Sequence, residues 1–314
     1  MSRENEGIFK AGIALIFFGG TFFVSGLRRH RQLKAVEDTP SSDIRSAAQG
    51  LVEFQGHALP YERAYVSSDG RSTVYRDLKI QKYVRRGKNS SWETIHQETE
   101  GNQFVLSDGT GLALVHLNDA EFVLNETKTA WKAFPGEVQS DLVQRYGGVV
   151  SGLRPGGGGF FSFGGEEFRF LEKNIRVGSP VYLRGSFSTT AGLAPYVIEP
   201  VHLQFLGKLA SLRKETGGKA KAFDLNRDGK IEEHEVARGS EKMLYQAKSG
   251  VQSGDQPEPV AFQGMLRSDS NHGLLIADCH QEHLNRKLGS FVLLRIFGGI
   301  AMIAVGVGVL AGLT

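Results

Sequence analysis

The chain of 314 residues carries 37 Lys and Arg against 34 Asp and Glu, which leaves a formal net charge of +3. This balance gives no global positive field, so nucleic acid is not expected as a partner. A single cysteine, Cys279, excludes an intramolecular disulfide framework and any zinc site built from several thiolates.

Two uncharged stretches, residues 11–27 and 296–313, lie near the two ends of the sequence. At about 1.5 Å of rise per residue, a helix of either length covers most of a hydrocarbon core of roughly 30 Å. Apolar neighbours extend both stretches, so we predict transmembrane helices over residues 8–27 and 289–313. The central region is therefore expected to work beside a bilayer.

Basic residues follow the first predicted span and precede the second; they are Arg28, Arg29, Arg31, Lys34, Arg286 and Lys287. No small-residue cleavage site accompanies the first group, which favours an uncleaved signal anchor over a signal peptide. By the positive-inside rule, these charges place the central region in the cytoplasm.

Alternation of apolar and polar residues predicts strands in the central region. Segments 50–59, 72–86 and 103–117 show this period-two pattern, and Arg76 occupies an apolar position of the second. Asp108-Gly109 separates two apolar runs and predicts a hairpin turn. We predict an α+β fold: a mainly antiparallel β domain, for which a barrel-like arrangement is one form, between two transmembrane helices.

The predicted β-rich domain covers residues 45–205, and residues 206–248 form a separate unit of helical composition. Residues 249–288 then return to the β domain. Within this return, AFQGMLRSD and GLLIADC are interpreted as a hairpin. The segment HQEHLNRKL is interpreted as a helix that continues into the second span.

Residues 224–235 fit the calcium-loop pattern of an EF-hand without a gap. Calcium takes hard oxygen ligands, which this loop type supplies from side chains at positions 1, 3, 5 and 12 and from the carbonyl at position 7. The predicted ligands are Asp224, Asn226, Asp228, the carbonyl of Lys230, and Glu235. The alternative interpretation is an acidic helix cap that binds no metal.

EF-hands usually act in pairs, and no second loop is found in the sequence. Arg227 and Lys230 also lower the net negative charge of the loop. We therefore expect calcium affinity in the micromolar-to-millimolar range, with Ca²⁺ as the cofactor.

Three weaker patterns leave alternatives open. Cys279, His280 and His283 lack a fourth strong metal ligand, so a helix N-terminus ahead of the second span is the plainer interpretation. Phenylalanines within 160–163, in a glycine-rich segment, either dip into the membrane or belong to a self-packed loop. A basic, aromatic-bearing strand pair over residues 75–88 faces anionic lipid headgroups or nucleic acid, or is a solvated strand face.

In the second predicted span, Ala304, Gly308 and Gly312 lie four residues apart on one helix face. Small residues allow helices to pack closely, either against the first span or between two chains. A homo-oligomer through this face is one expected arrangement, and lipid-exposed glycine is the alternative.

The order of segments resembles that of a known domain. An apolar span is followed by GLVEFQGHAL, TVYRDLKIQ, SSWETIHQE, QFVLSDGTGLALVHL and FRFLEKNIRVGSPVYLRGSF, and GLLIADCHQEHLNRKL then enters a second span. This layout is similar to the GIDE-type, or "beside a membrane", domain of membrane-anchored RING ubiquitin ligases in mitochondria and chloroplasts, and of shorter bacterial relatives. The EF-hand region looks like an insertion in that layout.

The resemblance implies a β domain held at a bilayer, and a bacterial inner membrane is the expected location. A RING finger holds two zinc ions through seven or eight Cys and His ligands, whereas this chain has one cysteine and ends at Thr314. Ligase activity, and catalysis in general, are therefore not expected. In the organellar ligases this domain faces the intermembrane space, which leaves the side of the membrane open.

We thus expect a two-pass membrane protein that acts as a calcium-responsive, non-catalytic scaffold or interaction module for a protein partner. The alternative is a module that recruits substrates for a separate ubiquitin ligase.

Overall fold

The computed structural model describes residues 3–37, 42–86, 89–150, 153, 167–189, 194–215, 233–252, 254–270, 272–278 and 281–311. The chain divides into two compact units. Residues up to Pro40 and from His280 onward form a helical unit, and Ser41–Cys279 form a β-rich unit.

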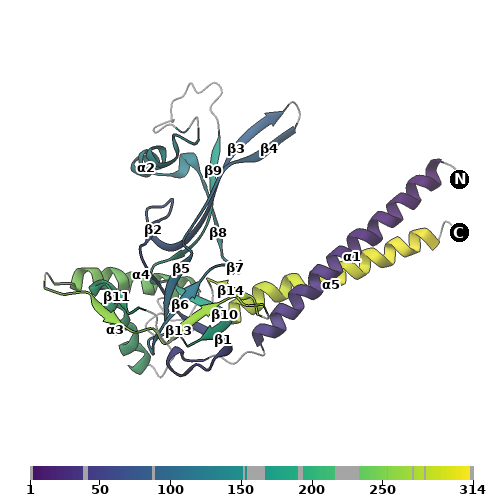
Figure 1. Cartoon of the computed structure of the whole chain (residues 1–314). Helices are drawn as coiled ribbons and strands as arrows, with labels where there is room; N and C mark the ends of the chain where they lie inside the picture. Colours follow the sequence, from purple (N-terminus) through teal and green to yellow (C-terminus); the bar gives the residue numbers. More distant parts are fainter. Residues whose placement is uncertain are drawn as a thin grey trace. The chain divides into compact units, whose positions relative to one another are not determined.

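The helical unit consists of α1 (Arg3–Glu37) and α5 (Gln281–Ala311), which run antiparallel (Figure 1). Among the described residues, one stretch is long and apolar enough to cross a membrane, Phe9–Leu27 of 19 residues. The apolar stretch found in α5, Arg295–Ala311, is shorter. By length and apolar composition, the described residues therefore support the first predicted span and not the second.

Glycines at intervals of seven residues bring α1 and α5 together. Gly12, Gly19 and Gly26 of α1 face α5, and Gly299 and Gly306 of α5 face α1. A Cβ atom added at Gly19 would lie 2.8 Å from the carbonyl oxygen of Gly299, and one added at Gly299 would lie 2.8 Å from that of Gly19. The two backbones are thus in contact where the glycines cross, and no larger residue fits there.

The small-residue face predicted in the second span is not the face that packs against α1. Ala304 is exposed, and a Cβ added at Gly308 would meet no atom within 4 Å, whereas Gly306 contacts α1. Gly312 lies outside the described residues. The contact is made by a different set of glycines because the helix rotation is set by the partner helix.

The β-rich unit contains a closed five-stranded barrel. Its strands are β1 (Gly50–Pro60), β5 (Gln103–Ser107), β6 (Leu112–His116), β13 (Gly264–Arg267) and β10 (Pro180–Ser188). They are ordered β1-β5-β6-β13-β10, and β10 closes the ring by pairing with β1. All pairs are antiparallel except β6 with β13. In order along the chain these are strands 1-2-3-5-4, the strand order of an OB-fold barrel.

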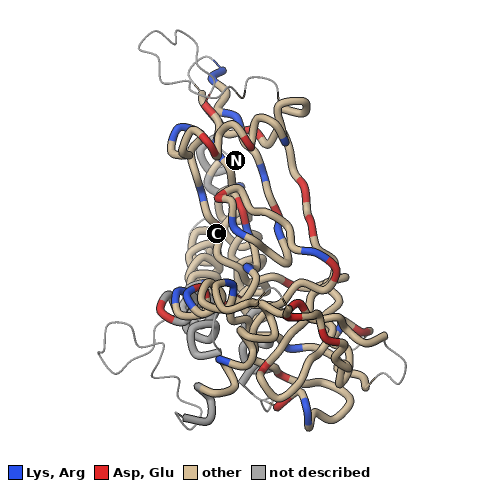
Figure 2. The backbone as a smooth tube through the Cα atoms, turned by 90° about the vertical axis from the view of Figure 1, so that its left-hand side faces the viewer, with Lys and Arg blue, Asp and Glu red and all other residues tan. Residues whose placement is uncertain are grey.

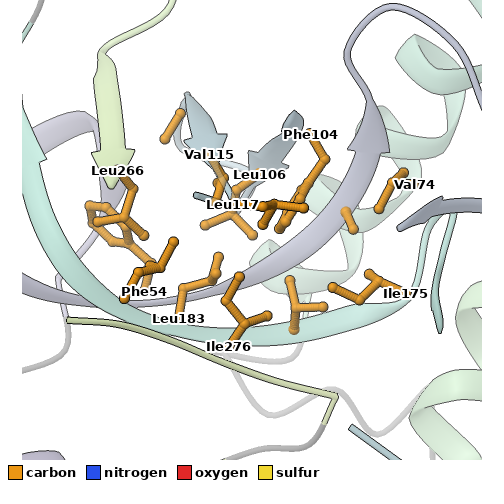
Figure 3. Close-up of a cluster of buried hydrophobic side chains, with 14 of the residues drawn as sticks. Phe54, Val74, Phe104, Leu106, Val115, Leu117, Ile175, Leu183, Leu266 and Ile276 are labelled. Atoms are coloured by element: carbon orange, nitrogen blue, oxygen red, sulfur yellow. The ribbon is translucent and has the colours of Figure 1, made fainter. Parts of the chain in front are cut away.

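The barrel closes because β1 changes partner along its length. Residues 50–57 of β1 pair with β10, and residues 57–60 pair with β5. At the change, a Cβ added at Gly56 would lie 2.5 Å from the carbonyl oxygen of Ser107, so only glycine allows this approach. The barrel interior is filled by alternate side chains, among which Phe54, Leu106 and Leu183 are fully buried (Figure 3).

The predicted hairpin at Asp108-Gly109 joins β5 to β6 and is confirmed. Gly109 has φ +82°, and a carboxylate oxygen of Asp108 accepts hydrogen bonds from the backbone N–H groups of Thr110 (2.8 Å) and Gly111 (3.1 Å). Side-chain bonding of this kind is how Asp favours turns.

The second hairpin, predicted in the return segment, is not formed. Strands β13 and β14 (Leu274–Ala277) both pair with β10, on neighbouring stretches of the same edge, and not with each other. Strand β14 also pairs in parallel with β7 (Ala120–Val123). Strand β13 thus completes the barrel wall, and β14 extends the sheet beyond it. The local sequence pattern predicts two strands in either case and does not say whether they pair with each other.

A second, antiparallel sheet contains β2 (Tyr65–Val66), β3 (Ser72–Arg86), β4 (Asn89–Glu100), β9 (Phe168–Arg176) and β8 (Glu126–Ala130). The short helix η2 (Trp131–Ala133) and α2 (Gly136–Tyr146) cover one face of it. Another short helix, η1 (Ile44–Ser46), precedes β1. The α+β class, the mainly antiparallel pairing and the barrel are therefore as predicted.

The connection from β10 to β13 carries the remaining elements (Figure 1). Strand β11 (Tyr196–Ile198) pairs with β12 (Glu258–Val260), and between them lie α3 (Pro200–Glu215) and α4 (Glu233–Gly250). This connection contains the predicted EF-hand region.

Candidate functional site

The candidate calcium loop lies between α3 and α4. Of the predicted ligands, Asp224, Asn226, Asp228 and Lys230 lie outside the described residues. Glu235 lies in the first turn of α4 and is 1% exposed. A glutamate that begins the exiting helix is the position-12 ligand of an EF-hand, which supplies two oxygens to calcium. The described residues alone contain no group of three His, Cys, Asp or Glu side chains that could hold a metal ion.

Helix α3 begins at a local sequence signal. Pro200 is its first residue, and the carbonyl of Glu199 accepts hydrogen bonds from the N–H groups of His202 (2.9 Å) and Leu203 (3.0 Å). Proline is favoured at this position because it lacks the N–H group that would have no partner in the helix.

A single glutamine links the two helices at the carboxyl end of α4. The amide of Gln204 in α3 donates to the carbonyl oxygen of Gly250 (3.0 Å) and to a carboxylate oxygen of Asp255 (3.3 Å). The same carboxylate oxygen accepts from the N–H of Gln252 (3.0 Å). These bonds tie the carboxyl end of α4 to α3 and to the residues that follow α4.

Large apolar side chains hold α3 and α4 against the outside of the barrel. Phe205 of α3 is fully buried, and its ring meets the His57 ring edge-on at 5.8 Å between centroids. The turn before β10 leaves room for it: Gly178 has φ +79°, and a Cβ there would lie 3.3 Å from the Phe205 ring. The shared cluster is formed by Leu59, Val105, Leu112, Tyr196, Ile198, Phe205 and Ala247.

This cluster covers the outer side of the first three barrel strands. Val105 of β5 and Leu112 of β6 belong to it, whereas Phe104 and Leu106 of β5 point into the barrel. In OB-fold barrels the face of the second and third strands, with the loops beside it, is the usual ligand-binding surface. Here a part of that face is occupied by the protein's own helix pair.

Buried polar groups lie within the same contact. His202 of α3 is 9% exposed, and burial together with the charge of Lys248 lowers its pKa to about 4. Its Nδ1 atom and the hydroxyl of Ser240 in α4 have no hydrogen-bond partner among the residues that the structure describes. The folded protein therefore favours neutral His202. The two polar atoms lose their contact with water and gain no hydrogen bond from the residues that the structure describes, which costs free energy.

Sequence analysis did not anticipate a buried ionic network beneath α2. Arg76 of β3 is 3% exposed and donates to Glu100 (Nε–Oε2, 2.9 Å) and to the hydroxyl of Tyr146 in α2 (Nη1–Oη, 2.8 Å). Arg76 also forms an ion pair with Glu98, which accepts a hydrogen bond of 2.5 Å from Tyr146. Its only sequence signal is an arginine at an apolar position of the strand.

The network fixes charges in place and does not expose them. Burial acts to raise the pKa of Glu98, but the hydrogen bond from Tyr146 and the charge of Arg76 outweigh it, so the pKa is lowered. Burial and the bond to Glu98 raise the pKa of the Tyr146 phenol. The carboxylate stays ionised and the phenol stays protonated near neutral pH, which suits a link between β3, β4 and α2 and not proton transfer.

The weaker sequence candidates are placed only in part. Cys279 and His280, the side chain of His283 and the phenylalanines of 160–163 lie outside the described residues. Asp278, beside the first of these, accepts a hydrogen bond of 2.7 Å from the N–H of Asn125.

Comparisons with protein-family models, curated proteins and solved structures give no match for this chain.

Proposed function

We propose that this chain is a two-pass membrane protein whose β-rich unit is a calcium-responsive, non-catalytic interaction module. One observation carries the calcium part. Glu235, the expected two-oxygen ligand, is buried in the first turn of α4, and α4 is packed with α3 on the outside of the barrel. A metal held by Glu235 would therefore act on a helix that covers the barrel.

The surface of α1 and α5 supports the membrane part. Phe9, Phe17 and Phe18 of α1 and Phe297 and Val305 of α5 are each between 42% and 68% exposed. Apolar area costs roughly 25 cal/mol per Å² in water, so this surface is stable only in hydrocarbon. Because α5 packs along the apolar stretch of α1, insertion of one helix carries the other with it. The stretch of α5 from Arg295 to Ala311, 17 residues long, covers about 25 Å, slightly less than a bilayer core.

Calcium binding would draw the loop oxygens and the Glu235 carboxylate around one ion. Because Gln204 fixes the other end of α4, the change falls on the first turns of α4. Glu235 and Ser240 are each 1% exposed, so a shift of these turns changes how α4 packs and which surface it presents. A partner that reads this surface would then respond to calcium.

The test is thermal unfolding of the full chain in detergent, in Ca²⁺, in Mg²⁺ and in chelator. We expect Ca²⁺ to raise the unfolding midpoint, by an amount equivalent to about 2.7 kcal/mol when its concentration is a hundred times the dissociation constant. Glu235→Gln should remove the response. Glu233→Gln changes the charge equally at loop position 10, which supplies no ligand, and should keep it. An unchanged midpoint at millimolar Ca²⁺, or equal responses of the two variants, would refute the proposal.

A further inference from the structure

The face of the second sheet that points away from α2 has a distinct composition. Along β3, Leu78 and Ile80 belong to the apolar cluster under α2. Side chains alternate between the two faces of a strand, so Lys79, Tyr83 and Arg85 lie on the opposite face. We call this surface the basic face; it consists of Lys79, Gln81, Tyr83 and Arg85 of β3, Thr94 and Trp92 of β4, and Arg169 of β9.

Contacts between these side chains confirm that they share one face. The rings of Tyr83 and Trp92, which are opposite each other in the β3–β4 register, lie 5.2 Å apart. The Arg85 guanidinium lies 5.6 Å from the centre of the Tyr83 ring, and that of Arg169 lies 4.2 Å from the centre of the Trp92 ring. Gln81 receives a hydrogen bond of 2.8 Å from Arg169. Two cations thus flank a pair of aromatic rings.

A carboxylate shares the basic face by the same alternation: Asp77 of β3, which accepts a hydrogen bond of 3.3 Å from Gln97. It forms no ion pair with the cations of the face among the residues that the structure describes. Within the described part of the chain, Lys79, Arg85 and Arg169 form no ion pair, whereas Arg86 on the other face pairs with Glu93 at 2.7 Å.

Both basic and acidic residues recur along the strands of this sheet (Figure 2), so the cations of the basic face are a local feature of one face. Arg85 is exposed, and Lys79 and Arg169 are partly exposed. Cations without a carboxylate partner attract anionic groups, and phosphate suits arginine because the guanidinium can donate two parallel hydrogen bonds.

The arrangement of the rings favours one kind of anion. Single-stranded nucleic acid binds by stacking bases on free aromatic faces, but Arg169 already covers one face of Trp92. Lipid headgroups need no free ring face. Trp and Tyr flanked by Arg are side chains that sit at the boundary between headgroups and hydrocarbon. The apolar stretch of α1 would hold the chain at a bilayer, which keeps headgroups at high effective concentration.

From this geometry we propose that the basic face binds the phosphate groups of anionic lipid headgroups. The contact is independent of calcium, and it relies on the proposed function only for the membrane anchor. It would hold the second sheet at the headgroup layer and leave the barrel face with α3 and α4 for another partner.

The test uses the full chain in nanodiscs of phosphatidylcholine alone or mixed with phosphatidylglycerol. Trp131 is replaced by phenylalanine, so that Trp92 is the only tryptophan. Brominated lipid tails quench a tryptophan that lies close to them. We expect brominated phosphatidylglycerol to quench Trp92 more strongly than brominated phosphatidylcholine does, and salt to reduce the difference. Slower hydrogen exchange in β3 and β4 in the anionic discs should accompany it.

Two neighbouring arginines supply matched variants. Arg85→Gln and Arg169→Gln should abolish the preference for the anionic lipid, whereas Arg86→Gln, which removes the same charge from the other face, should retain it. Equal quenching by the two lipids, or equal loss in Arg85→Gln and Arg86→Gln, would overturn the proposal. So would displacement of the lipid by a single-stranded oligonucleotide, which would assign the face to nucleic acid. A calcium response that persists in Arg85→Gln would separate this proposal from the calcium proposal.

Discussion

Two helix pairs in this protein meet their neighbours through opposite kinds of residue. Helices α1 and α5 touch through glycines such as Gly19 and Gly299, and their large apolar side chains point outward. Helices α3 and α4 bury Phe205 against the barrel, and a glycine of α3, Gly207, has no atom near the position of a Cβ.

The proposed membrane location of α1 and α5 accounts for this difference through the solvent of each pair. In water, burying a large apolar side chain removes it from contact with water and drives packing. In hydrocarbon that gain is absent, because lipid tails are as apolar as leucine, and helices associate through close van der Waals contact of their backbones. Glycine gives the closest approach between helix backbones. A helix pair in water therefore packs through large apolar residues, and a helix pair in hydrocarbon packs through glycine.

Truncation of Phe205 is expected to have the largest effect on stability. Phe205→Ala should lower the free energy of unfolding of the β-rich unit by roughly 3–5 kcal/mol, because a fully buried ring is lost and the cavity does not collapse. Tyr245→Ala on α4 removes a side chain that is 75% exposed and should change it by less than about 0.5 kcal/mol. Denaturant unfolding of the full chain in detergent measures both. Similar losses in the two variants would mean that the contact with the barrel contributes little.

The reverse substitution tests the membrane side. Gly19→Leu should weaken the α1–α5 pair by roughly 1–3 kcal/mol, because a Cβ already meets the backbone of α5. Gly20→Leu is the control, since a Cβ there meets nothing within 4 Å. Spin labels at Phe9 and Val307, which both point outward, report the distance between the helices in a Cys279→Ser background. An unchanged distance distribution in Gly19→Leu, or equal broadening in both variants, would contradict the glycine contact.

The sequence predicts features that depend on local interactions. The strands follow from alternation, the turn after β5 from Asp108-Gly109, and α1 from a continuous apolar run. The sequence left open whether Ala304 and Gly308 pack against α1, against a second chain or against lipid; the structure excludes the first of these, because Gly308 meets no atom of α1. Only the partner helix selects Gly299 and Gly306.

Contacts between residues far apart in the sequence could not be predicted from local patterns either. Arg76 contacts Glu98 and Tyr146, which are 22 and 70 residues away in sequence, and no local pattern connects them. For the candidate site, the loop motif alone predicts the ligands, and only Glu235 of them lies among the described residues. The position of α3 and α4 on the barrel depends on Phe205 meeting the turn at Gly178, and this meeting is invisible in the motif.

The smallest expected effect is a pH dependence of unfolding, and it concerns the contact of α3 with the barrel. His202 has a folded-state pKa of about 4 against an ordinary value of 6.5, so the unfolded chain binds the proton more readily. Stability is therefore complete above pH 6.5 and falls as the pH drops toward 4, by about 1 kcal/mol between pH 7.5 and pH 5.5. His202→Gln should reduce the pH dependence of the unfolding free energy by this amount. His272→Gln, at a side chain that is 39% exposed, is the control for replacing a histidine elsewhere in the same unit. If His202→Gln unfolds with the wild-type pH dependence, the histidine is not held neutral in the contact between α3 and the barrel, and water reaches this contact although it buries Phe205.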